Sequence, residues 1–247
     1  MREQYDNSVS HALEYYIADW NLANFAQALG KKEDAKLFRD RSLGYKHYYS
    51  KEFGTLRPIL PDGTFYYTFY VPHDIKGLAK LMGGDKKFVD HLQKVFDDGN
   101  YDPANEPDIA YPYLFSYFKG EAWRTQKLVR QLLKDCYHNA PNGVPGNEDT
   151  GTMSAWAIFS MMGFYPACPG DVNYVLTSPT FDKVTIQLDK KFYPKGELVI
   201  ESKHSNPEAI YIKDVFAGDK KLKGYTISQE DLVNAGTLRY ILEDTHK

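Results

Sequence analysis

The chain has 247 residues, of which 43% are hydrophobic and 26% are charged, as in an ordinary globular protein with a full core. Its net charge of -3 argues against nucleic acid or an anionic membrane as the main partner, and no stretch is long and apolar enough to cross a bilayer. The first residues, Met1 to Asp6, are polar, so we expect no secretory signal on this chain. Aromatic residues are frequent, at 15%, and they can either fill a core or stack on sugar rings.

The first two thirds of the chain carry the hydrophobic pattern of helices. Residues 8–29 place apolar side chains on one stripe that closes at Gly30, and residues 32–49 repeat the pattern, which predicts a helical hairpin. Further helices are expected at residues 71–81, 85–96, 113–118, 122–137 and 153–162, the last one ending at Gly163.

From about Tyr174 the hydrophobic period changes from helical to alternating. The alternating segments are residues 174–177, 183–188, 197–201, 210–212 and 237–242. They predict an antiparallel sheet of about seventy residues. The expected protein is therefore mainly α, with antiparallel helical hairpins forming part of a toroid over residues 1–172 and a small C-terminal antiparallel β region over residues 173–247.

Three loops between the expected helices carry polar residues that could do chemistry, and in a toroid of hairpins such loops meet at one end. The first contains Asn105, Glu106, Pro107 and Asp108. An amide oxygen followed by a carboxylate in an irregular loop suits a hard cation such as calcium. The alternative is a helix N-terminus, with Pro107 at the first helical position and Asp108 favoured by the helix dipole.

The second loop lies between Val144 and the apolar helix that follows it, and it contains Asn147, Glu148 and Asp149. Two adjacent carboxylates at the mouth of a buried helix are costly unless something uses them. A helix cap explains one of them, because Asp149 or Thr150 can accept from the first free amides. The other carboxylate and the preceding asparagine point to a functional site.

The third loop contains His73 and Asp74. His73 is either a functional imidazole or a hydrogen-bonded, half-buried side chain, and Asp74 is either functional or the N-cap of the next helix. The two cysteines, Cys136 and Cys168, are far apart in the sequence, so they cannot form a metal knuckle, and they are either bridged or free.

Several motifs together resemble glycoside hydrolase family 92, the calcium-dependent exo-acting α-mannosidases, along essentially the whole chain. The matching pieces are Val-Pro-His-Asp at 71–74, Asn-Glu-Pro at 105–107, Trp-Arg-Thr-Gln at 123–126, Gly-Val-Pro-Gly-Asn-Glu-Asp-Thr-Gly-Thr-Met-Ser-Ala-Trp at 143–156 and Gly-Phe-Tyr-Pro-Ala-Cys-Pro-Gly at 163–170. The long central motif is highly specific.

The resemblance implies a larger protein than these residues. Members of the family carry an N-terminal β-sandwich followed by a barrel of six helical hairpins, an (α/α)6 toroid, with the site at their interface, and they are often secreted or periplasmic. This chain is similar to the second half of the barrel plus the C-terminal strands. We therefore expect exposed apolar faces where the missing helices would pack.

The resemblance also implies roles for the loop residues. Inverting hydrolysis needs a carboxylate base and an acid across the sugar ring, and Asp149, with Glu148 beside it, matches the base. Asn105 and Glu106 match the calcium loop, where the cation binds the 2- and 3-hydroxyls of mannose. The expected substrate-binding residues are His73, Asp74, Asn147 and Asp108.

One departure from the family pattern concerns the general acid. The family has a glutamate a few residues before the Val-Pro-His-Asp stretch, whereas residues 60–70 of this chain contain none. Asp62 is a possible substitute, but it lies in Pro-Asp-Gly, which is more typical of a tight turn.

Three functions follow as hypotheses. The first is a calcium-dependent inverting exo-α-mannosidase of the α-1,2 type, or a fragment of one, acting on mannose-containing glycans. The second, favoured by the missing glutamate, is hydrolysis of mannose-1-phosphodiesters, whose leaving group needs no proton. The third, favoured by the missing first half, is a non-catalytic carbohydrate-binding remnant. For the chain by itself we expect little or no mannosidase activity, because losing an acid typically removes about 10²–10⁴-fold of rate.

Overall fold

A computed structural model describes residues 8–56, 67–206 and 208–246 of the chain. Contacts group the chain into two compact units, Met1–Asp102 and Pro103–Lys247, and each is described by itself. The predicted division at residue 172 follows the change from helices to strands rather than compactness, and it stays a prediction. Within the described residues, no helix combines the length and the apolarity needed to cross a membrane.

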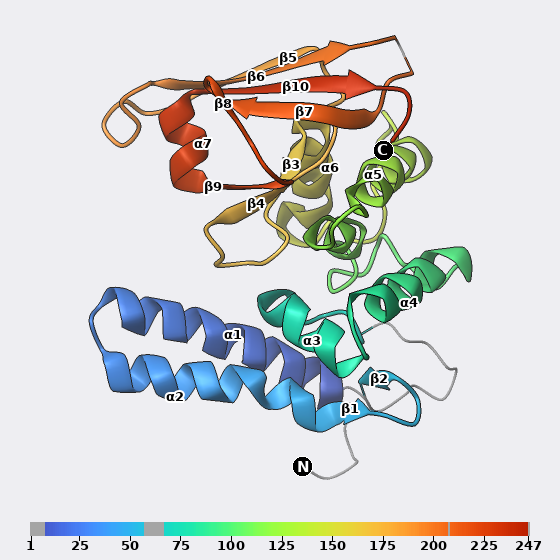
Figure 1. The fold of residues 1–247 in the computed structure, drawn as a ribbon, viewed down its shortest axis with the longest axis vertical. Coiled ribbons are helices and arrows are strands. Elements are labelled where there is room, and N and C mark those ends of the chain that lie inside the picture. Colours follow the sequence, from blue (N-terminus) through green and yellow to red (C-terminus); the bar gives the residue numbers. More distant parts are fainter. Residues whose placement is uncertain (1–7, 57–66, 207, 247) are drawn as a thin grey trace. The chain divides into compact units, whose positions relative to one another are not determined.

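The first unit consists of helices and one small β-hairpin. Helices α1 and α2 form the predicted hairpin and lie side by side (Figure 1, blue). A 3-10 helix continues α2, a second one precedes α3, and the predicted helix at 85–96 is confirmed as α4. The elements are α1 (Ser8–Ala28), α2 (Lys32–Ser42), η1 (Leu43–Tyr48), β1 (Tyr49–Ser50), β2 (Thr55–Leu56), η2 (Pro72–Asp74), α3 (Ile75–Leu81) and α4 (Asp85–Asp97).

Helix α1 carries apolar side chains on more than the face that it buries. Leu13 and Ala23 are fully buried, as the helical stripe predicts. Tyr15, Leu22 and Phe25 are 66%, 44% and 63% exposed, at spacings of seven and three residues that put them on another face. An exposed apolar face is what the resemblance led us to expect, and what packs against it stays a prediction.

The second unit begins with helices that surround the central motif. They are η3 (Tyr111–Tyr117), α5 (Ala122–Cys136), η4 (Asp149–Gly151) and α6 (Thr152–Met162). Gly163 ends α6 in the left-handed conformation, with φ of 96°, as the sequence predicts. A side chain there would press on Pro179, whose ring atoms lie 3.0 Å from the position of a Cβ atom.

The strands form two small sheets rather than one antiparallel sheet. One has the order β3-β4-β9, and the other has the order β5-β6-β10-β7-β8. Helices α5 and α6 lie on the same side of the five-stranded sheet (Figure 1). The elements are β3 (Phe164–Tyr165), β4 (Asn173–Leu176), β5 (Lys183–Gln187), β6 (Glu197–His204), β7 (Tyr211–Ala217), β8 (Lys220–Lys221), β9 (Thr226–Ser228), α7 (Gln229–Ala235) and β10 (Thr237–Glu243).

The prediction of a purely antiparallel C-terminal sheet is wrong at one strand. Strand β10 pairs in parallel with β6, from Thr237 opposite Val199 onward, and in antiparallel fashion with β7. The reason is helix α7, which the sequence reading missed. Ser228 is its N-cap, with an Oγ that accepts from the amide of Asp231 at 3.0 Å. The helix carries the chain back so that β10 inserts between β6 and β7. The described chain is thus a mixed α and β protein, and its place in a toroid stays a prediction.

Many of the aromatic residues fill the core beneath the central motif. Trp156 of α6 is fully buried, and its ring stacks on that of Tyr137 with centroids 5.3 Å apart. Tyr113 stacks on Tyr165 at 4.6 Å. The indole N–H of Trp156 donates to the carbonyl of Ile109 at 2.8 Å, which fastens α6 to the segment after the first candidate loop.

Candidate active site

The central loop has an unusual backbone. Among the residues that the structure describes, the non-glycine residues with positive φ are three consecutive ones, Glu148 (70°), Asp149 (23°) and Thr150 (59°). Gly151 follows with φ of 86°. Each such residue costs roughly 1–3 kcal/mol, and backbone strain of this kind concentrates at functional sites.

Glu148 holds this loop against the start of α6. Its Oε1 accepts from the backbone amide of Ser154 at 2.9 Å, and its Oε2 accepts from the Ser154 hydroxyl at 2.8 Å. Because Ser154 lies in the first turn of α6, Glu148 caps that helix. The sequence reading gave the cap to Asp149 or Thr150; the structure gives it to Glu148, because the left-handed backbone turns its side chain toward the helix.

Asp149 is fixed through its backbone instead. The hydroxyls of Thr150 and Thr152 each donate to its carbonyl oxygen at 2.6 Å. The side chain is exposed, as is that of Asn147, and no described residue donates a hydrogen bond to the Asp149 carboxylate. The carboxylate can therefore accept a proton from a water molecule or from a ligand hydroxyl.

The first candidate loop is a series of turns. The amide of Asp108 donates to the carbonyl of Asn105 at 2.9 Å, and the amide of Tyr111 donates to that of Asp108 at 2.8 Å. Helical structure begins only at Tyr111, so the reading of Pro107 as the first residue of a helix is wrong. Asn105 and Glu106 are half-buried, and Asp108 is fully buried.

The two loops touch at Gly146. A Cβ atom on this residue would lie 2.9 Å from the Cβ of Ala104 and 3.0 Å from its carbonyl oxygen, so only glycine allows the approach. The contact brings the loop of Asn105 and Glu106 against the loop of Glu148 and Asp149. That their side-chain oxygens face one pocket stays a prediction.

The donor set suits calcium in part. The Asn105 amide and the Glu106 carboxylate offer hard oxygen atoms in an irregular turn. Calcium takes about six to eight oxygens, so backbone carbonyls, water and sugar hydroxyls would have to supply the others. Within the described residues, no three of His, Cys, Asp or Glu come together as a metal-binding group.

Asp74, in the first unit, is engaged in structural contacts. Its Oδ1 accepts from the amide of Gly77 at 3.0 Å, which makes it the N-cap of α3, as one of the two readings expected. Its Oδ2 accepts from the Tyr45 hydroxyl at 2.8 Å, and the Lys46 amine lies 3.4 Å away. A role for Asp74 in substrate binding stays a prediction.

His73 is held in one tautomer. Its Nε2–H donates to the carbonyl of Ser42 at 2.9 Å, since a carbonyl can only accept, and its ring meets Tyr45 edge-on with centroids 5.9 Å apart. Burial lowers the pKa of His73, so the neutral imidazole is favoured. Its Nδ1 is buried without a hydrogen-bond partner in the described chain. Contact with a sugar stays a prediction for this residue too.

The candidate acid and the two cysteines complete the list of residues singled out from the sequence. Asp62, the candidate acid, lies outside the described residues. Cys136 and Cys168 are both free thiols. Burial raises the pKa of Cys168 to about 12, so its thiol is inert at neutral pH.

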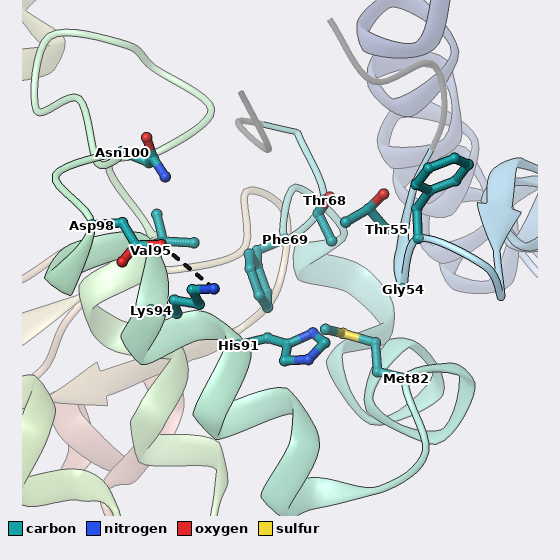
Figure 2. A pocket seen from close by; sticks show the side chains of 11 residues that line it. Gly54, Thr55, Thr68, Phe69, Met82, His91, Lys94, Val95, Asp98 and Asn100 are labelled. Atoms are coloured by element: carbon teal, nitrogen blue, oxygen red, sulfur yellow. Dashed lines mark ion pairs between the residues drawn. The ribbon is translucent and has the colours of Figure 1, made fainter. Parts of the chain in front are cut away.

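The sequence reading missed a pocket in the first unit, shown in Figure 2, with a volume of about 220 Å³. One wall is formed by His91 and Lys94 of α4 and by Asp98, the C-cap of this helix, and the Lys94 amine lies 3.8 Å from the Asp98 carboxylate (Figure 2). Thr55 and Phe69 contribute to its lining. The spacing of three and four residues along a helix was the signal that could have shown this face.

The family follows from comparison with known proteins. The comparison places the chain among the glycoside hydrolases. Residues 1–244 match the glycosyl hydrolase family 92 catalytic domain, and the chain belongs to this family.

Solved structures agree. A family GH92 α-mannosidase from Bacteroides thetaiotaomicron superposes with a TM-score of 0.88 at 28% identity, covering 98% of this chain and 35% of that one. A family GH92 inverting mannosidase from the same species has a TM-score of 0.83 at 26% identity, covering 96% and 37%. An uncharacterized secreted glycosidase of Arthroderma benhamiae is 27% identical over 95% of this chain and 35% of its own length. The chain thus spans about a third of these relatives.

Proposed function

We propose that this chain is the part of a calcium-dependent, inverting exo-α-mannosidase that carries the catalytic base and the calcium loop. The observation that carries the proposal is the division between two adjacent carboxylates. Glu148 is held by Ser154, whereas Asp149 is exposed, is fixed through its backbone and has no partner for its carboxylate among the described residues. A base needs just such a group, fixed in place but available to a proton.

In the proposed reaction, the Asp149 carboxylate takes a proton from water as the water oxygen attacks the anomeric carbon on the face opposite the leaving group. The glycosidic bond breaks, and a proton from an acid across the ring reaches the leaving oxygen. Asp62 is our proposal for this acid, although its side chain is one methylene shorter than the glutamate of the family.

Asn105 and Glu106 would hold the calcium ion, with Asp108 beside them and Asn147 and His73 as sugar contacts. When bound, the cation supplies positive charge that orients the 2- and 3-hydroxyls of mannose and favours a distorted ring. Two of the similar proteins are an α-mannosidase and an inverting mannosidase, which supports this substrate and this stereochemistry. They concern proteins about three times as long, so activity of a complete enzyme is part of the proposal.

The test combines binding with turnover. The purified chain is given an aryl α-mannoside, an α-1,2-mannobiose and a mannosyl phosphodiester, each with calcium and with a chelator. We expect calcium-dependent mannose binding and little turnover, with any turnover of the aryl substrate falling about 10²–10⁴-fold in Asp149→Asn. Asp135→Asn, an exposed aspartate on α5, is the matched control and should change nothing.

The pattern across substrates separates the alternatives. Cleavage of the phosphodiester but not of the disaccharide would favour the phosphodiesterase function, and binding without any turnover would favour a carbohydrate-binding remnant. Absence of both calcium-dependent mannose binding and hydrolysis would contradict the proposal.

A further inference from the structure

A second cavity lies in the second unit, where the first turn of α5 meets the five-stranded sheet. Its volume is about 360 Å³, at the lower end of the roughly 300–1,000 Å³ typical of small-molecule sites. No residue of the two candidate catalytic loops lines it. Its chemically distinctive lining residues are Trp123, Gln126, Tyr211, Asp214, Lys221 and Glu243.

Gln126, a residue of the cavity lining, carries a hydrogen-bond donor that no described residue uses. Its side chain is 1% exposed, and its Oε1 accepts from the amide of Ile212 on β7 at 2.9 Å. Because a backbone amide needs an acceptor, this bond fixes the orientation of the carboxamide, and the Nε2 group is left as the free end. Nε2 is buried and has no hydrogen-bond partner among the described residues. Such a group is costly unless a water or a ligand oxygen accepts from it.

The charges around the cavity balance. Lys221 forms an ion pair with Asp214, and the Lys213 amine lies 3.9 Å from the Glu243 carboxylate. With each cation matched to an anion, neither a charged acid nor a charged amine finds an uncompensated partner. The lining instead offers carboxylate acceptors next to amine and amide donors, which suits a neutral ligand whose groups both donate and accept. Hydroxyl groups have this property.

The remaining wall is aromatic. The rings of Trp123 and His246 stack in parallel with centroids 4.1 Å apart, and the Arg124 guanidinium lies over the Trp123 ring at 4.7 Å, so the faces of the indole are covered. Tyr211 meets His246 at 5.2 Å, so Tyr211 and the exposed His246 are the rings left to face a ligand. Trp123 and Tyr211 are half-buried, and His246 is exposed. An aromatic wall next to polar groups is complementary to a ligand with an apolar C–H face and a rim of hydroxyls. A pyranose ring is such a ligand.

We propose that this cavity is a second carbohydrate site, separate from the candidate active site, that binds one neutral sugar residue. Gln126 Nε2 and the Lys221 amine donate to ring hydroxyls, the carboxylates of Asp214 and Glu243 accept from them, and Tyr211 and His246 contact the C–H face, with Trp123 directly behind His246. The choice of mannose as the probe rests on the proposed function, whereas the class of ligand follows from the lining.

The three tryptophans of the chain allow a test in which the two sites report separately. The ¹⁵N-labelled chain is titrated with methyl α-mannoside and an α-mannose oligosaccharide, with and without calcium, and the indole N–H resonances are followed. Trp123 reports on the new site. Trp156, bonded to Ile109 beside the candidate calcium loop, reports on the active site, and Trp20 of the first unit is the reference. Trp→Phe variants assign the three signals.

We expect a saturable shift of the Trp123 resonance that does not require calcium. Glu243→Gln should weaken this binding about tenfold, because a charged acceptor is replaced by a neutral one. Glu201→Gln is the matched control, since this glutamate faces Lys183 at 3.5 Å in the same sheet but does not line the cavity, and it should leave the affinity unchanged. Unshifted Trp20 and Trp156 resonances in each variant show that the fold is intact.

The other outcomes of the titration distinguish the second site from the proposed active site. A calcium-dependent shift at Trp156 alone would support the proposed function and overturn the second site. A shift at Trp123 alone would uphold the second site even if the proposed function fails. No shift at Trp123 up to the solubility of either sugar, or equal weakening by Glu243→Gln and Glu201→Gln, would mean that water fills the cavity and that the inference is wrong.

Discussion

The left-handed backbone at Glu148 predicts an unusual order of stability between two substitutions. At most positions glycine is less stable than alanine, because it loses more conformational freedom on folding. At Glu148, with φ of 70°, the order should be reversed. Glu148→Gly should leave the protein more stable than Glu148→Ala.

The magnitude follows from two contributions. Both substitutions remove the carboxylate that accepts from the amide and hydroxyl of Ser154, and losing such a half-buried cap costs about 1–2 kcal/mol. Alanine keeps the strain of positive φ, whereas glycine removes about 1 kcal/mol of it. Glu148→Ala should therefore be about 1–2 kcal/mol less stable than the unmodified chain, and Glu148→Gly about 0–1 kcal/mol less stable.

The assay is urea or thermal unfolding followed by circular dichroism, where 1 kcal/mol corresponds to about 2–4 °C in a chain of this size. Glu121 is the matched control. It precedes α5 in the same way and its carboxylate accepts from the side chain of Arg124 at 2.7 Å, but its φ is -107°. There alanine should be at least as stable as glycine. If Glu148→Ala equals or exceeds Glu148→Gly while the control keeps its order, the backbone at Glu148 is not left-handed and the account of the loop is refuted.

Three further outcomes are expected. Gly77→Ala should lower the free energy of unfolding by about 1–2 kcal/mol in a urea titration, because the new Cβ would lie 2.1 Å from the Asp74 carboxylate and displace the N-cap of α3. The control is Gly224→Ala, whose Cβ would meet nothing within 4 Å and which should leave the stability unchanged. Burial lowers the pKa of His73 below 6.5, so as the pH falls the unfolded chain binds the proton before the folded chain does. The urea midpoint should therefore be highest above pH 6.5 and fall below it. If the dependence of the midpoint on pH were the same in His73→Gln, this explanation would be contradicted. Asp149→Asn should shift stability by less than about 0.5 kcal/mol, because no residue in the described part of the chain bonds to its carboxylate; a larger loss would mean that the carboxylate has a partner.

Local patterns predicted most of the elements of the fold. Helix α4 was readable because its apolar residues keep helical spacing after the pair Gly83 and Gly84, and α6 because Gly163 ends it. The positions of the strands followed from alternation. The order of the strands did not follow, because alternation assigns faces and not neighbours, and the insertion of β10 depends on contacts distant in the sequence.

The candidate site was predictable in its residues but not in its geometry. The pattern Gly146-Asn-Glu-Asp149 showed that something unusual lies before α6, and Gly146 is required by the close approach of Ala104. Which carboxylate caps the helix depends on three residues that adopt positive φ without being glycine, and propensities disfavour that conformation. The orphaned donor of Gln126 was also invisible, because its partner on β7 is distant in the sequence.

The contacts of the central loop bear on two requirements of a general base, the role proposed for Asp149. The base must be held in one direction, yet hydrogen bonds to its carboxylate would favour the charged form and make it a weaker acceptor of protons. The contacts of the loop fix the backbone of Asp149 without touching its carboxylate, because Glu148 anchors one side of the turn to Ser154 and two threonine hydroxyls hold the carbonyl of Asp149 itself. The strain of the left-handed turn is then offset by the same contacts that cap α6. Of the two adjacent carboxylates, Glu148 thus holds the turn and Asp149 is the proposed base. The stabilities of the Glu148 variants test the structural role of Glu148 independently of any catalytic assay.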